Sequence, residues 1–270
     1  MKIDCHQHVN WQGIDAQKLL AHLDSLSVDK AWLHSWEAID GGLEWNYIHI
    51  SISDLIKTCE AYPERFIPFA APDPRRPEVV SRLEKLVKKG VKGYGELKVH
   101  TTYDSPDCVR IFRRCGELGL PVLFHLQYLI EDFQPEVWYG GHIDNVERAL
   151  KLCPETNFIG HGPGWWAEIS DDGQALTSHY PTGPIIPGHI IRLLRSYPNI
   201  YADISAGSGL NALKRDRHFG REFLINHAEK VLYGTDWIDD GHMKFLEELT
   251  LPEKVANKIF FENALRLVPA

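Results

Sequence analysis

Short apolar runs alternate with longer amphipathic segments along the whole chain, and this alternation constrains the fold more than any other feature. It predicts eight strands, over residues 2–5, 30–34, 66–71, 91–97, 121–126, 157–160, 199–204 and 230–234. Their first residues lie 25 to 42 positions apart, which leaves room each time for a helix and two loops. The strands are almost continuously apolar, as is typical of parallel strands covered on both faces. We therefore expect an α/β protein with a single (β/α)8 TIM barrel.

The segments between these strands have helical periodicity. Residues 16–26 and 77–89 carry apolar side chains at spacings of three and four, and Pro106 is expected to open a further helix. Later helices are predicted over residues 142–152, 188–195, 221–228, 242–249 and 253–267. No linker, low-complexity tract or repeat divides the chain, so residues 1–270 are predicted to form one domain. Two long connections, residues 127–141 and 162–187, follow strand ends where barrel active sites are built.

Potential metal ligands occur at the carboxyl ends of several predicted strands. His6 and His8 follow strand 1 at a spacing of two, so they point to the same side. The other candidates end strands 4, 5, 6 and 8: Glu96, His125, His161 and Asp236. A barrel brings these ends around one axis, and burying such groups without partners costs several kcal/mol each. A His-x-His pair alone is weak evidence, but the whole set predicts a divalent metal site at the mouth of the barrel.

Three further motifs carry a resemblance to a known family. They are Gly160-His161-Gly162-Pro163-Gly164, Tyr233-Gly234-Thr235-Asp236 and Glu262-Asn263-Ala264-x-Arg266-Leu267. Together with the ligand set, they resemble the amidohydrolase superfamily of metal-dependent (β/α)8 hydrolases. The similarity covers essentially the whole chain and is to the amidohydrolase-related branch. That branch also contains non-hydrolytic members resembling aminocarboxymuconate semialdehyde decarboxylase.

The resemblance implies a role for each candidate ligand. His6, His8, His125 and Asp236 would hold the principal metal, whose bound water would have its pKa lowered to about 7. Asp236 would also accept the proton of this water. His161 would bind a second metal, or contact the substrate oxygen and stabilise developing charge.

Glu96 decides whether the site holds one ion or two, because it could bridge two metals or contact only ligands and substrate. Zinc is the expected ion, although histidine and carboxylate ligands also suit manganese, iron and nickel.

Residues near the predicted mouth are candidates for substrate binding. Lys98 lies on the face of Glu96 and could meet that carboxylate or one on the substrate; a carbamylated lysine is an alternative. Trp11 and Trp165, with other loop tryptophans, could wall an aromatic pocket or simply cover the barrel rim. Ser208 belongs to a glycine-rich stretch, residues 206–211, predicted to be a turn that could hold an anion. His34 and His100 are expected to be structural.

Composition restricts the location and the partners. The net charge of −8 argues against nucleic-acid binding, and no run reaches the roughly 18 apolar residues of a membrane span. Five scattered cysteines without a C-x-x-C pair, and the absence of an apolar leader at Met1, predict a cytoplasmic protein. The tryptophan-rich loops would permit a homodimer.

We expect the protein to hydrolyse a small ester, lactone or amide with metal-activated water. The alternatives are metal-dependent decarboxylation or hydration of a small unsaturated carboxylic acid, and a non-catalytic metal-binding barrel. No predicted strand ends in an arginine that could clamp a carboxylate, and this favours hydrolysis.

Overall fold

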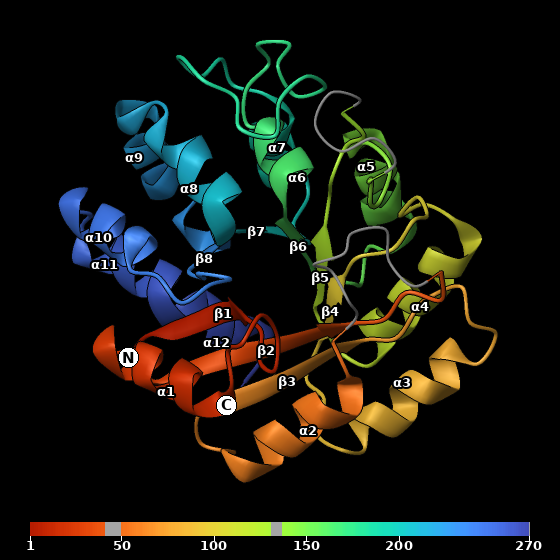
Figure 1. The fold of residues 1–270 in the computed structure, drawn as a ribbon. Helices are drawn as coiled ribbons and strands as arrows, with labels where there is room; N and C mark the ends of the chain where they lie inside the picture. Colours follow the sequence, from red (N-terminus) through yellow and green to blue (C-terminus); the bar gives the residue numbers. More distant parts are fainter. Residues whose placement is uncertain (41–49, 131–136, 270) are drawn as a thin grey trace.

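A computed structural model describes residues 1–40, 50–130 and 137–269. Eight parallel strands lie at the centre with helices around them (Figure 1). The strands are β1 (Ile3–Gln7), β2 (Lys30–Trp36), β3 (Phe66–Ala71), β4 (Tyr94–Leu97), β5 (Val122–His125), β6 (Phe158–His161), β7 (Ile200–Asp203) and β8 (Val231–Leu232). Each overlaps a predicted strand, and β3 has the predicted bounds.

Hydrogen bonds between neighbouring strands close the barrel. Strands β1 to β3 pair in order, and so do β4 to β8. Strands β3 and β4 are joined by the amide of Ala70, which donates to the carbonyl of Gly93 at 3.1 Å. Strands β8 and β1 are joined by the amide of Cys5, which donates to the carbonyl of Tyr233 at 2.8 Å. The predicted (β/α)8 barrel is therefore confirmed, and the carboxyl ends of all eight strands meet at one mouth.

Helices cover the outside of this barrel. They are α1 (Ala16–Ser25), α2 (Ile52–Ala61), α3 (Val79–Val87), α4 (Pro106–Glu117), α5 (Ile143–Leu152), α6 (Pro163–Ala167), α7 (His189–Ser196), α8 (Ala206–Lys214), α9 (Arg217–Asn226), α10 (Gly241–Glu248), α11 (Glu253–Asn257) and α12 (Asn263–Leu267). A 3₁₀ turn, η1 (Ala228–Lys230), precedes β8, and a π-helical turn, η2 (Lys258–Glu262), joins α11 to α12. In the described chain no helix is both long and apolar enough to cross a membrane.

Local signals explain where several helices begin. Ser105 accepts a hydrogen bond from the amide of Cys108, and Pro106 occupies the first turn of α4 as predicted. The side chain of Asp15 accepts from the amide of Lys18 at the start of α1. These caps satisfy amides that have no partner within the helix.

The glycine-rich stretch at residues 206–211 is a correction to the prediction, because it forms the start of helix α8 and not a turn. The reason is close packing: a Cβ atom at Gly209 would lie only 2.2 Å from the carbonyl oxygen of Ile204. Here glycine permits contact between a helix and the preceding backbone, a need that local turn chemistry does not indicate.

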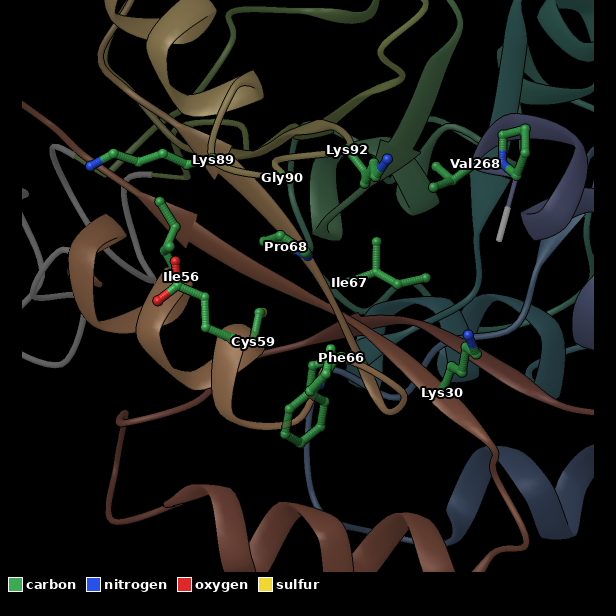
Figure 2. Close-up of a pocket in the computed structure, with 13 residues that line it drawn as sticks. Lys30, Ile56, Cys59, Phe66, Ile67, Pro68, Lys89, Gly90, Lys92 and Val268 are labelled. Atoms are coloured by element: carbon green, nitrogen blue, oxygen red, sulfur yellow. The ribbon is translucent and has the colours of Figure 1, made fainter.

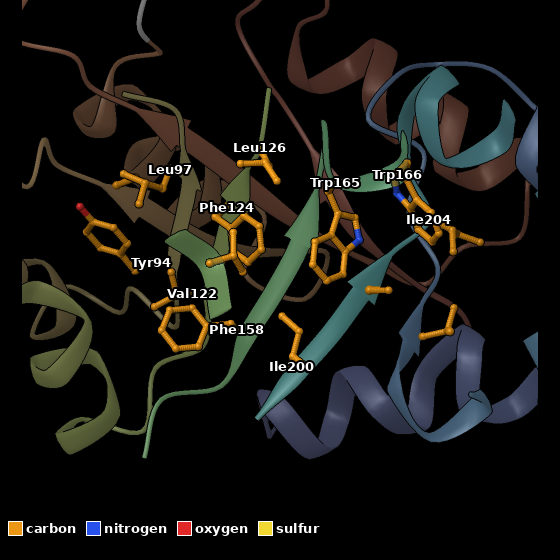
Figure 3. Close-up of a cluster of buried hydrophobic side chains, with 14 of the residues drawn as sticks. Tyr94, Leu97, Val122, Phe124, Leu126, Phe158, Trp165, Trp166, Ile200 and Ile204 are labelled. Atoms are coloured by element: carbon orange, nitrogen blue, oxygen red, sulfur yellow. The ribbon is translucent and has the colours of Figure 1, made fainter. Parts of the chain in front are cut away.

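The core has two parts. The larger lies between the strands and the helices and includes Phe124, Phe158 and Trp165 (Figure 3). The smaller contains side chains from successive strands: Ile3, Cys5, Trp32, Phe69, Leu123, Ile159, Tyr201 and Leu232, with Ala264, Leu267 and Val268 from the C-terminal segment. We call this second cluster the apolar layer.

Candidate metal centre

The candidate site lies directly beyond the apolar layer on the same strands. On β5, Leu123 belongs to the apolar layer and His125 follows two residues later; on β6, Ile159 and His161 repeat this arrangement. His125 and His161 are direct partners in the parallel ladder. Because alternate residues of a strand share a face, the barrel interior changes from apolar to polar within one step.

Five predicted ligands converge. The Nε2 atom of His8 is 3.2 Å from Nε2 of His6, 3.1 Å from Oδ1 of Asp236 and 3.4 Å from Oε2 of Glu96. The Nε2 atom of His161 is 3.8 Å from Oε1 of Glu96 and 3.7 Å from Oδ2 of Asp236. Two sets have ligand atoms within 4.8 Å of one another: His6, His8 and Asp236, and His6, Glu96 and His161. These side chains, except Asp236, are almost fully buried.

The outer nitrogens of the three histidines have protein acceptors. Nδ1 of His6 lies 2.7 Å from Oδ2 of Asp203, and Nδ1 of His161 lies 3.1 Å from the same oxygen. Nδ1 of His8 lies 3.0 Å from the carbonyl oxygen of His34. When Nδ1 carries the proton, Nε2 presents a lone pair, so these contacts direct a ligand nitrogen of each ring towards the cluster.

Two buried atoms at the centre of the cluster have no hydrogen-bond partner within the described chain, Nε2 of His161 and Oδ1 of Asp236. Leaving such atoms unpaired is costly, whereas a divalent cation would satisfy them together. The donor set of imidazole nitrogens and carboxylate oxygens suits such an ion. The residues present therefore fit a divalent metal ion.

The electrostatics of the cluster favour a cation as well. Burial lowers the pKa of His6, but Asp236, Asp203 and Glu96 outweigh it and hold this pKa well above its usual value. Burial would raise the pKa of Glu96 and of Asp203, yet hydrogen bonds with the surrounding histidines hold both well below the usual range. The carboxylates are therefore ionised, and they attract positive charge strongly in this buried site.

His125, predicted to be a principal ligand, has contacts unlike those of the other three histidines, and its ligand role stays a prediction. Its Nδ1 lies 2.6 Å from Oε1 of Glu96 and its Nε2 lies 3.1 Å from Oε1 of Gln127, so both nitrogens have protein partners. It belongs to neither of the potential metal-binding groups in the described chain. Burial, helped by the charge of Lys98, lowers its pKa to about 4 against the opposing effect of Glu96. His125 therefore contacts the candidate ligand Glu96 as a neutral ring.

Asp203 is the functional candidate that sequence reasoning missed. It is completely buried at the end of β7, and its carboxylate accepts from Ser205 Oγ at 2.7 Å besides contacting the two histidines. A signal was present, because Asp203 follows the apolar-layer residue Tyr201 by two positions, as His161 follows Ile159. Asp203 connects His6 and His161, which lie far apart in the sequence.

Aromatic side chains and one lysine lie beside the cluster. The ring centre of His8 lies 5.3 Å from that of Trp11 and 5.1 Å from that of Trp36. The ring centres of Trp11 and Trp237 are 5.7 Å apart. The ammonium group of Lys98 lies 5.5 Å from the ring centre of Trp36 and 5.1 Å from that of Tyr139. The structure thus brings Trp11 and Lys98 close to the candidate ligands.

Trp165, predicted to line a substrate pocket, lies in the larger apolar core. It is fully buried on α6, 5.6 Å from the ring of Phe124, within the core outside the strands (Figure 3). Gly160 leaves room for it, since a Cβ atom there would lie 2.4 Å from the indole. Ser208 is buried on α8, and its hydroxyl has no hydrogen-bond partner among the described residues. Among the residues that the structure describes, no contact places either side chain at the cluster.

The fold and the donor set define a class of protein, a (β/α)8 barrel with a metal-compatible centre at its strand ends. The chain belongs to the amidohydrolase family, which matches residues 3–270. This family is metal-dependent and its members are enzymes. No functionally curated protein sequence matches the chain significantly.

Solved structures share the fold at low sequence identity. The chain is similar to 5-carboxyvanillate decarboxylase from Sphingomonas paucimobilis, with a TM-score of 0.66, 17% identity and coverage of 99% of this chain and 98% of that one. It is also similar to a protein from Pseudomonas putida assigned as a 2-pyrone-4,6-dicarboxylic acid hydrolase (TM-score 0.66, 15% identity, coverage 98% and 96%). A third is dihydroxybenzoic acid decarboxylase from Polaromonas sp. JS666, solved with bound manganese (TM-score 0.62, 16% identity, coverage 98% and 96%).

Proposed function

We propose that this protein is a metal-dependent hydrolase that cleaves a C–O or C–N bond of a small ester, lactone or amide. One observation carries the proposal: buried ligand atoms from β1, β4, β6 and the segment after β8 face one another, and two of them have no hydrogen-bond partner in the described chain. Such a cluster at the mouth of an amidohydrolase barrel suits activation of water. Residues 1–270 would act as one domain.

The ligands in this proposal are His6, His8, Glu96, His161 and Asp236. His6 belongs to both potential metal-binding groups, and its Nε2 lies 3.8 Å from Oε2 of Glu96 and 3.5 Å from Oδ1 of Asp236. One nitrogen lone pair binds a single ion. We therefore propose one metal in this arrangement. When bound, a divalent ion polarises a carbonyl oxygen and makes hydroxide available at neutral pH.

The surrounding residues would then move protons and orient the substrate. Asp236, 20% exposed at its side chain, would accept the proton of the attacking water and pass it to the leaving group. Asp203 would hold His6 and His161 with Nε2 facing the cluster. Trp11 and Trp36 would exclude water on the side of His8, and Lys98 would orient a polar group of the substrate.

Decarboxylation or hydration of a small carboxylic acid is the second candidate, and Lys98 is the observation that favours it. A buried ammonium group beside the site could hold a carboxylate. Two arginines offer less support. Arg215, directly after α8, bonds to Asp172, and Arg217, the first residue of α9, bonds to Glu248 at 2.8 Å. Hydrolysis therefore remains the main proposal.

We propose zinc as the bound ion, with manganese as the main alternative because a structure of similar fold contains it. The cytoplasmic location, the homodimer and the lack of nucleic-acid binding stay predictions.

Elemental analysis of the purified protein tests the metal centre. We expect about one metal atom per chain, retained after gel filtration. Glu96→Gln should weaken retention of that ion, whereas Glu253→Gln on the exposed face of α11 should not. A value near two would contradict the single ion, and a value near zero that added zinc or manganese cannot restore would overturn the proposal.

Activity assays then separate the candidate reactions. Ester, lactone and amide panels should give metal-dependent turnover, and small unsaturated acids should release no carbon dioxide. Carbon dioxide release without hydrolysis would favour the second candidate. A stable metal complex that turns over neither panel would support a non-catalytic barrel.

A further inference from the structure

A second concave site lies at the opposite end of the barrel from the metal centre. Its volume is about 350 Å³, and it is lined where strands β2 and β3 begin, by helix α2, and by the C-terminal segment (Figure 2). Lys30 is the first residue of β2 and Phe66 the first of β3, whereas the metal cluster lies at the carboxyl ends of the strands. We call this site the basal pocket.

The wall of the basal pocket is mainly apolar. Phe66, Ile56, Cys59 and Val268 are buried side chains on its lining, and Ile67 is half-buried. Figure 2 shows Ile67 near the centre, with Ile56 and Cys59 on one side and Val268 on the other. This lining suits the apolar part of a ligand, and the volume is within the range of small-molecule sites, about 300–1,000 Å³.

The pocket also carries an excess of positive charge. Lys30, Lys89 and Lys92 line it, together with one acid, Glu60. Within the described ranges, none of these three lysines forms an ion pair. In a chain with net charge −8, three such cations around an apolar wall are complementary to an anion.

The positions of these charges orient the ligand. Glu60 follows Cys59 on α2, and Figure 2 shows Lys89 on the side of Ile56, so the α2 side carries apolar surface with one acid and one lysine. Figure 2 places Lys30 and Lys92 on the side of Val268, away from Ile56 and Cys59. A carboxylate would therefore lie towards Lys30 and Lys92, with its apolar chain directed towards α2.

We propose that the basal pocket binds a monocarboxylic acid with an apolar chain. Tight binding would require both parts of the ligand. The lysines would attract the carboxylate, and Ile56, Phe66 and Ile67 would contact the apolar chain. The site is separate from the metal centre, so this binding does not depend on the proposed hydrolysis.

Titration calorimetry with octanoate as the probe tests the proposal on the full chain. Octanamide, which lacks the charge, and acetate, which lacks the chain, should each bind at least about tenfold more weakly than octanoate. The double variant Lys30→Glu/Lys92→Glu should weaken octanoate binding by about tenfold or more. Lys254→Glu, an exposed change on α11, serves as the matched control and should bind like the unmodified protein.

A neutral double variant, Lys30→Gln/Lys92→Gln, provides the same test if charge reversal perturbs folding, and circular dichroism checks both. Undiminished octanoate binding to a folded double variant would overturn the proposal, as would no binding to the unmodified protein at millimolar concentration. Equal affinity for octanamide would remove the role of the lysines, and equal affinity for acetate would remove that of the apolar wall.

Discussion

Inside the barrel, an apolar layer and a polar layer lie on the same strands, two residues apart. The apolar layer includes Trp32, Leu123, Ile159 and Tyr201, and the polar layer includes, in the same strand order, His34, His125, His161 and Asp203. Both layers are buried, so exposure to solvent does not distinguish them. They differ in what each side chain needs from its neighbours.

Apolar side chains need only close packing, and each contributes about 1.5–3 kcal/mol on burial. Polar groups at the same depth need specific partners, and those partners come from other strands. The residues that stabilise the barrel and those suited to chemistry are therefore separated along each strand by a single step of the side-chain alternation. Substitutions in one layer should therefore have effects that the other layer does not show.

The largest effect is expected from removing a candidate ligand at the polar end of the barrel. His8→Ala should reduce metal affinity by more than about 100-fold, beyond the range typical of residues behind the ligands, and should abolish turnover with it. Metal content per chain and activity are measured together. His218→Ala, an exposed histidine on α9, should retain both. A His8→Ala protein with full metal content would place the ion elsewhere.

The matching change in the apolar layer should lower stability without altering the ligands. Leu123→Ala should reduce the free energy of unfolding by about 2–5 kcal/mol, because it leaves a cavity in the barrel. Denaturant titration measures this loss, and metal content per folded chain should be unchanged. Leu152→Ala on the exposed end of α5 should cost less than about 0.5 kcal/mol. Loss of metal in folded Leu123→Ala would mean that the layers are not separable.

A substitution at Asp203 tests whether a residue that contacts the candidate ligands contributes to metal affinity. Asp203→Asn keeps the shape but removes the charge that holds Nδ1 of His6 and His161, so metal affinity should fall by about 10- to 100-fold. Competition with a coloured chelator measures the affinity, and the absorption spectrum of the cobalt-substituted protein reports ligand geometry. Asp171→Asn, an exposed change in the loop after α6, is the control. Unchanged affinity and spectrum would show that the histidines need no such support.

The smallest effect concerns a histidine outside both layers. Burial, with the nearby charges of Arg195 and Lys230, lowers the pKa of His227 to about 4. The unfolded chain, with a histidine pKa of about 6.5, binds this proton first as the pH falls, so the native state loses stability between pH 6.5 and 4.

His227→Gln should make the acid-induced loss in the free energy of unfolding smaller by about 1 kcal/mol. This value takes into account that solvent screens the charge of the partly buried ring. Unfolding free energies of the metal-free proteins at pH 7.5 and 4.5 measure it. Parallel pH profiles would contradict the prediction, whereas acid sensitivity remaining in the variant would be assigned to the polar layer and other titrating groups.

Particular elements show why some features could be predicted. Residues 66–71 form β3 as expected, because an apolar run between helical segments is a local pattern. His6, His8, Glu96, His161 and Asp236 could be proposed together because each lies at or just beyond a strand end, and a barrel brings those ends to one mouth. Local pattern and fold geometry were sufficient for these residues.

The sequence did not predict which residues contact one another. Trp165 and Trp11 both follow strands, yet Trp165 packs outside the barrel because Gly160 leaves space for its indole. Predicted helix 253–267 contains a π-helical turn, and predicted turn 206–211 begins a helix. Each difference depends on atoms from a distant segment or on packing that periodicity does not encode.

The sequence by itself determined the barrel, the alternation of layers and the candidate ligands, since these follow from short-range periodicity and strand order. Only the tertiary structure decided that Glu96 and Gln127 contact His125, that Asp203 contacts two candidate ligands, and that lysines from two segments line the basal pocket. The physical reason is distance along the chain: hydrogen bonds and ion pairs act over a few ångströms, and folding alone brings their partners within that range.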